Sequence, residues 1–167
     1  MLAWYLVYTK PQRERLALEN LERQGYQAYL PLIRNRRRRA GRYVALIEPM
    51  FPRYLFLYLS DVTDNWGPIR STLGVSKMVR FGDMPARVPD DLIETLRSRE
   101  DEAGVQDLAP PEFKAGDRIR IVEGPMAGYE GIYQAKTGQE RVVILLEIVG
   151  QSSRVQLAAG HIEPASS

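Results

Sequence analysis

The sequence contains no cysteine, which excludes a disulfide framework and any thiolate metal site. Its one histidine, His161, cannot form a histidine metal cluster, and the sequence has no glycine-rich phosphate loop or nucleophile motif. No apolar run approaches the ~20 residues of a membrane span, and the N-terminus lacks the basic and long apolar segments of a signal peptide. We therefore expect a cytoplasmic protein that is not an enzyme and needs no metal or cofactor.

Charge is distributed unevenly between the two parts of the chain. Residues 1–100 contain 17 Lys and Arg against 11 Asp and Glu, whereas residues 101–167 contain 6 against 10. Because a basic surface attracts the phosphate backbone, the first part is the better candidate for binding nucleic acid. The acidic second part is better suited to protein partners.

A polar stretch without helical or strand periodicity separates these two parts. It runs through residues 101–112 and ends near the adjacent prolines Pro110 and Pro111, which is typical of a linker. We therefore predict an N-terminal domain over residues 1–100 and a C-terminal domain over residues 113–167.

The N-terminal domain alternates strand and helix patterns, which predicts an α+β fold. Alternating or continuous apolar runs predict strands at residues 4–8, 26–33, 43–47, 54–59 and 77–81. Helical patterns cover residues 11–25, 64–73 and 90–99, and the first of these begins with proline and ends with glycine. Residues 34–42, which include four consecutive arginines, are predicted to connect two strands and to favour phosphate.

The C-terminal domain carries the pattern of a small barrel. Ile119 and Ile121 alternate with arginines, and residues 124–131 hold three glycines and a proline suited to turns. The apolar run 142–149 remains ambiguous, because its β-branched residues favour a strand while its length permits a helix.

Residues 116–131 resemble the KOW motif, in which a strand enters a tight glycine turn and returns. Further segments resemble the N-terminal domain of the NusG class of transcription elongation factors; they are Trp4–Tyr5, Lys10 and residues 21–24, 48–56, 74–75 and 79–82. Within that class, residues 79–82 and 144–149 are most similar to the specialised paralogue RfaH. Trp66 and residues 69–71 instead resemble the housekeeping factor, and Pro68 and Leu73 replace polar residues that RfaH uses near DNA.

This resemblance implies a specific fold for each domain. The N-terminal domain would have an antiparallel sheet with helices, and the C-terminal domain would be a five-stranded KOW β-barrel. The alternative, known from RfaH, is a C-terminal α-helical hairpin docked on the N-terminal domain. Helical proline costs about 3 kcal/mol and each glycine about 1 kcal/mol relative to alanine, so Pro125 and its neighbouring glycines favour the barrel.

The resemblance also implies a polymerase-binding face. By analogy with the family, it would grip the clamp helices of the β′ subunit, near the β subunit; its residues are Leu6, Tyr8, Pro52, Tyr54, Phe56 and Phe81. Tyr54 and Phe56 share one face of a predicted strand, so they can form an exposed aromatic pair. From the sequence alone, burial of these rings in the core is the competing interpretation.

A second implied surface would bind the non-template DNA strand. Arginine and lysine neutralise phosphates, while asparagine and glutamine can read base edges. The residues are Lys10, Arg13, Asn20, Arg23 and Gln24 on the first predicted helix, with Arg70, Thr72, Gly74 and Val75 added by the resemblance. The competing interpretation of the helix is an ordinary solvated face.

The C-terminal domain would bind a small-subunit ribosomal protein, or Rho in the housekeeping factor. Glu48, Ile148 and Val149 are the interdomain or partner-binding candidates, with Val149 exposed. The expected function is that of a monomeric elongation and antitermination factor that suppresses pausing. The alternatives are a housekeeping factor that recruits Rho, and a ribosome-associated or RNA-binding KOW protein, for which the acidic C-terminal domain is unfavourable.

Overall fold

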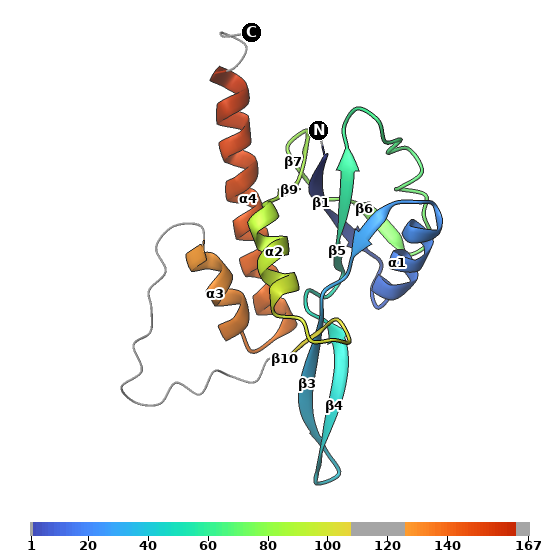
Figure 1. Cartoon of the computed structure of the whole chain (residues 1–167), viewed down its shortest axis with the longest axis vertical. Coiled ribbons are helices and arrows are strands. Elements are labelled where there is room, and N and C mark those ends of the chain that lie inside the picture. The colour runs from blue at the N-terminus through green and yellow to red at the C-terminus, as the bar shows by residue number, and fades with distance from the viewer. Residues whose placement is uncertain (1, 108–125, 163–167) are drawn as a thin grey trace.

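The computed structural model describes residues 2–107 and 126–162 (Figure 1). The predicted strand at Ile119 and Ile121 and the first two residues of the predicted glycine turn lie outside the described residues. Within the described residues, no helix is long and apolar enough to cross a membrane.

The centre of the N-terminal domain is a five-stranded antiparallel sheet in the order β2-β5-β1-β6, with β9 also paired to β1. Its strands are β1 (Leu2–Thr9), β2 (Gln27–Tyr29), β5 (Tyr54–Ser60), β6 (Val75–Met78) and β9 (Arg87–Val88). A separate short ladder joins β7 (Arg80–Phe81) to β8 (Met84–Pro85). The predicted α+β architecture of this domain is confirmed.

Side chains of β1 alternate between two cores, because successive residues of a strand point to opposite faces. Tyr5 and Val7 pack with Ala17 and Leu21 of α1 (Glu14–Arg23). Trp4 and Leu6 pack on the opposite face with α2 (Asp90–Ser98) and with the C-terminal helices. Helices therefore cover both faces of the sheet.

Three local predictions in the N-terminal domain are wrong. Residues 64–73 form successive turns rather than a helix, with Ile69 and Thr72 each donating a backbone hydrogen bond to the residue three positions earlier. The predicted strand 26–33 is two strands, β2 and β3 (Leu32–Arg39). The arginine stretch is not a connection but the end of β3, which pairs with β4 (Arg42–Pro49) in a hairpin that projects from the domain (Figure 1).

The C-terminal residues form helices where barrel strands are predicted. Helix α3 (Met126–Gln134) and helix α4 (Gly138–Ile162) form a hairpin beside α2 (Figure 1). The barrel prediction is therefore wrong for the described part, and the helical alternative describes it. The cost of the helical glycines is offset by burial, because Leu145 and Val149 of α4 are completely buried against the N-terminal domain.

The beginning of the predicted linker is a strand. β10 (Val105–Asp107) pairs in parallel with the first residues of β3, which makes a three-stranded sheet with β4. No periodic pattern predicted β10, since three residues are too few to show alternation.

Candidate functional site: a covered aromatic face

The residues predicted to bind polymerase come together on one face of the sheet, which we call the aromatic face (Leu6, Tyr8, Pro52, Tyr54, Phe56 and Phe81). The antiparallel register of β1 and β5 places Leu6 opposite Phe56 and Tyr8 opposite Tyr54. The Tyr8 and Tyr54 rings lie with their centroids 5.1 Å apart, and the Arg53 guanidinium stands 4.0 Å from the Tyr8 centroid.

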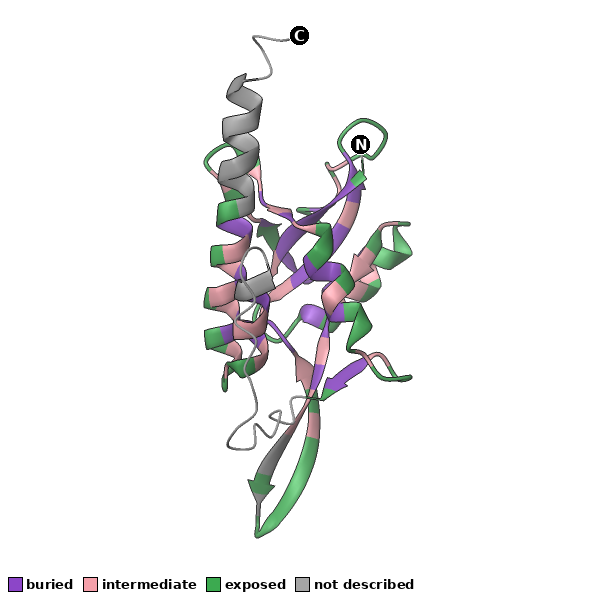
Figure 2. Cartoon of the chain, turned by 60° about the vertical axis from the view of Figure 1, so that its left-hand side comes forward, coloured by how far each residue is buried: buried purple, intermediate pink, exposed green. Residues whose placement is uncertain are grey.

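The C-terminal helices cover much of this face. Leu6 and Phe56 are completely buried in one core together with Tyr129, Leu145 and Val149. Tyr54 and Phe81 are partly buried and pack against the same core. In Figure 2, the buried and half-buried residues of α4 face the domain while exposed residues mark its outer side. The rings are therefore buried, as the competing interpretation expected, but partly by another segment of the chain, and polymerase binding stays a prediction.

Val149 is buried rather than exposed, which corrects its predicted orientation. The prediction used the two-residue period of a strand, in which Ile148 and Val149 point to opposite sides. In the helix, Leu145 and Val149 are four residues apart and share the face that meets the sheet, while Ile148 packs at its margin.

A close backbone approach fixes the start of α4 beside the aromatic face. A Cβ atom at Gly138 would lie 2.6 Å from Cγ of Pro52 and 2.8 Å from its Cδ. Only glycine fits at this position without a shift of the proline ring or of the helix. At Gly150 a Cβ would meet the Phe81 ring at 3.7 Å, which is ordinary contact.

Arg141 of α4 makes buried hydrogen bonds beneath the helical hairpin. Its side chain is only 2% exposed, and Nε donates a hydrogen bond of 2.8 Å to the main-chain carbonyl of Met50. Nη1 donates to the carbonyl of Ala135 at 3.3 Å. Burial lowers the pKa of Arg141 below its usual value, and the carboxylates of Glu48 and Glu140 oppose that shift. Arg141 joins the interdomain contact predicted around Glu48.

Sequence reasoning missed Arg141, although one signal pointed to it. It immediately precedes the apolar run that begins at Val142, where a charged residue has to be solvated or paired. Glu48 itself accepts a hydrogen bond of 2.9 Å from Nδ2 of Asn35, so the β3–β4 hairpin holds this carboxylate in place.

Helix α3 makes one ion pair and also carries a buried hydroxyl that lacks a hydrogen-bond partner among the described residues. Arg99 donates to Glu130 at 2.8 Å and places its guanidinium 3.8 Å from the centroid of the Tyr133 ring. The Tyr133 hydroxyl is buried without a hydrogen-bond partner among the described residues, and burial raises its pKa to about 12. An unpaired buried hydroxyl opposes docking of the helix.

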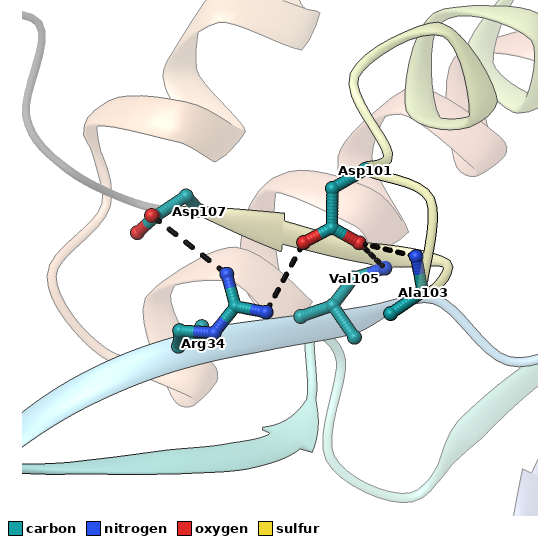
Figure 3. Close-up of polar contacts among 5 residues, drawn as sticks. All are labelled: Arg34, Asp101, Ala103, Val105 and Asp107. Carbon is teal, nitrogen blue, oxygen red and sulfur yellow. Dashed lines mark hydrogen bonds and ion pairs between the residues drawn. The ribbon is translucent and has the colours of Figure 1, made fainter.

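The start of the linker is held to the N-terminal domain by acidic and basic side chains (Figure 3). Asp101 accepts backbone hydrogen bonds from Ala103 and Val105 at 2.9 and 3.0 Å. Arg34 of β3 donates to Asp101 at 3.1 Å and pairs with Asp107 at 3.8 Å. The two carboxylates of the linker therefore bracket one guanidinium, and β10 lies along β3 between them.

The predicted DNA surface is partly assembled. Gln24, the C-cap residue of α1, donates to the Thr72 hydroxyl at 2.7 Å, and Asn20 donates to the carbonyls of Leu16 and Leu73 at 2.9 and 3.5 Å. Helix α1 and the segment before β6 therefore form one continuous surface. The exposed cations of this set are Lys10, Arg13, Arg23 and Arg70.

Three residues predicted for DNA binding have structural roles in this fold. Gly74 has φ +94°, and a Cβ there would lie 2.8 Å from the backbone nitrogen of Ala17. Val75 is buried in the core beneath α1, and Thr72 is buried with its hydroxyl donating to Pro68. The contact between Gly74 and α1 therefore needs glycine whether or not DNA binds.

In this fold the C-terminal helices occupy a surface of the N-terminal domain. Comparison with known proteins identifies the family. The family model described as "Transcription termination factor nusG" matches residues 2–97. The chain therefore belongs to the NusG family of transcription termination and antitermination factors.

Relatives named "Transcription termination/antitermination protein NusG" align along most of the chain. The protein from Thermus thermophilus is 25% identical over 182 aligned residues, covering 98% of this chain and 99% of its own length. The protein from Vibrio cholerae is 23% identical, covering 90% and 84%. The solved structure described as "Domain interaction in Thermotoga maritima NusG" shares 23% identity and covers 57% of this chain and 55% of its own, with a TM-score of 0.39.

Proposed function

We propose that this chain is a specialised elongation factor of the RfaH type, whose polymerase-binding face is closed by its own C-terminal helices until it reaches a transcription complex. The observation that carries the proposal is the burial of Leu6 and Phe56 under Leu145 and Val149. A face that is already apolar and aromatic suits the clamp helices of the polymerase β′ subunit once the hairpin leaves. Bound there and beside the β subunit, the N-terminal domain suppresses pausing.

DNA binding accompanies this contact. The exposed cations on and near α1, together with Arg70, neutralise phosphates of the non-template strand, while Asn20 and Gln24 lie at the same surface. Arg38 and Arg42, near the tip of the β3–β4 hairpin, are exposed and suit nonspecific contact with nearby duplex DNA.

The C-terminal segment has a second role after release. Its residues 113–167 carry a KOW-like sequence that favours a barrel, while the described part is helical. A KOW-like sequence that adopts helices here suits a segment that closes the aromatic face as helices and recruits a partner as a barrel. The proposed partner is a small-subunit ribosomal protein, which would couple transcription to translation.

A reversible disulfide between the hairpin and the N-terminal domain tests this mechanism. Because the sequence has no native cysteine, only the introduced pair can form a disulfide within the chain. The close approach of Pro52 and Gly138 suits the pair P52C and G138C, since disulfide Cβ atoms stand about 3.5–4.5 Å apart. The oxidised chain should fail to bind core polymerase in a co-purification assay, and reduction should restore binding. Equal binding in both states would refute autoinhibition, while the P52C single variant reports any effect of losing the proline.

A housekeeping role with Rho as the partner is the second candidate, because the curated relatives carry the housekeeping name. The two candidates differ in one assay. A housekeeping factor stimulates Rho-dependent termination on a purified template, whereas the specialised factor leaves it unchanged or reduces it.

A further inference from the structure

A basic cavity lies between the loop before β6 and the edge of the sheet. Its volume is about 470 Å³, and its walls are Trp66, Gly67, Arg70, Lys77, Met78 and Arg80. This volume falls within the roughly 300–1,000 Å³ of small-ligand sites. Strand β6 ends the sheet on this side, so the cavity opens at an unpaired strand edge.

The charge of the cavity is of one sign. Arg70, Lys77 and Arg80 are all exposed, and no acidic side chain is among the residues that line it. Within the part of the chain that the structure describes, none of these three cations forms an ion pair. Arg80 donates to the carbonyl of Asp83 at 3.2 Å, and Nζ of Lys77 lies 5.8 Å from the centroid of the Tyr8 ring. Three neighbouring cations without a counter-charge favour an anionic ligand.

Trp66 gives the cavity a fixed aromatic wall. Its Nε1 donates a hydrogen bond of 2.9 Å to the carbonyl of Ser60, and its ring meets Tyr5 edge-on with centroids 4.7 Å apart. The indole is half-buried, so part of it remains available to the cavity. An oriented aromatic ring beside several cations is the combination that holds single-stranded nucleic acid by base stacking and phosphate contact.

We propose that this cavity binds one nucleotide of single-stranded DNA, with its base stacked on Trp66 and its phosphate held by Lys77, Arg80 and Arg70. The inference rests on the proposed DNA binding and extends it. Arg70 belongs to both surfaces, so a strand that crosses α1 continues past it to the edge of β6. Lys77 and Arg80 thereby become DNA-binding residues.

The test uses the full chain and a 12-nucleotide oligothymidylate. Binding should quench the fluorescence of Trp66, and W66F should abolish the quenching, because the other tryptophan, Trp4, is buried in the opposite core. The K77Q/R80Q variant should bind several-fold more weakly, and the slope of log affinity against log salt should fall by about 1 for each lost phosphate contact. K136Q removes an exposed lysine from the turn between α3 and α4 and should bind normally.

A second variant separates this inference from the DNA surface on which it rests. If K10Q/R23Q weakens binding while K77Q/R80Q does not, the DNA surface stands and the cavity is refuted. If neither variant weakens binding, both are refuted. Quenching by the oligothymidylate but not by a duplex of equal length supports base stacking, and equal quenching by both overturns it. Circular dichroism of each variant confirms that it is folded.

Discussion

Arg141 and Met50 are joined by a buried hydrogen bond of 2.8 Å from the guanidinium Nε to the main-chain carbonyl, across 91 residues of sequence. The bond links the first turn of α4 to the chain between β4 and β5. It joins a charged donor to a neutral acceptor at a buried side chain. Such a contact is costly to break on one side only, because the carbonyl of Met50 loses its partner.

Replacing Arg141 by glutamine should therefore loosen the helical hairpin. The expected loss is about 1.5–3 kcal/mol of docking free energy, the range of hydrogen bonds to charged groups. Amide hydrogen exchange of α4 measures it as faster exchange. Q139A, at an exposed position two residues earlier, is the matched control, and unchanged exchange in R141Q would show that the bond does not hold the helix.

Replacing Tyr133 by phenylalanine should have the opposite effect. The hydroxyl is buried and unpaired among the described residues, so its removal relieves a desolvation penalty of about 1–3 kcal/mol while the ring still stacks on Arg99. Exchange of α3 amides should slow, and polymerase binding by the full chain should weaken. Faster exchange in Y133F would mean that the hydroxyl has a partner in solution.

Gly74→Ala tests whether that glycine is required for folding stability. The new Cβ would stand 2.8 Å from the nitrogen of Ala17, at a φ of +94° that alanine disfavours. We expect a loss of at least about 1 kcal/mol in the free energy of unfolding, measured by urea denaturation. G25A, also at positive φ but with open space around it, should lose less. Equal losses in the two variants would remove the packing argument.

The attachment of β10 should depend on pH. Backbone hydrogen bonding from Val105, followed by the contact with Arg34, lowers the pKa of Asp101 below its usual value of 3.8. A lowered pKa means that this contribution is complete above the unfolded-state pKa and is lost as pH falls through the folded-state pKa. Acid below about pH 4 should therefore accelerate exchange at the Val105 amide.

Two variants test whether Asp101 and Arg34 hold β10 in place. R34Q should weaken the attachment at neutral pH, while D101N should remove most of its dependence on acid. An amide at Val105 that exchanges equally fast at pH 3 and pH 6, after correction for intrinsic rates, would show that Asp101 does not hold the strand.

The sequence was informative where apolar patterns were long. Residues 4–8 and 54–59 predicted the two central strands, and the pairing of Leu6 with Phe56 brought the predicted aromatic face together. Short elements were not predictable: β10 has three residues, and residues 64–73 form successive turns instead of the predicted helix.

The C-terminal helices show a different limit. The run 142–149 is compatible with a strand or a helix, and local propensity favoured the strand. Contacts with the N-terminal domain, which no local pattern encodes, bury Leu145 and Val149 in the helix. Arg141 was missed for the same reason, since its partner is a backbone carbonyl far along the chain.

The strand β10 also determines how far the C-terminal segment can travel. It fixes the chain to β3 as far as Asp107, and α3 begins at Met126, so the connection spans residues 108–125. A fully extended chain of that length spans about 65 Å at most, at 3.3–3.6 Å per residue. In the proposed mechanism, a released hairpin would therefore stay near the aromatic face at a local concentration on the order of millimolar. Dilution of the protein leaves that concentration unchanged. Any partner that keeps the aromatic face open therefore has to compete with the helical hairpin of the same chain.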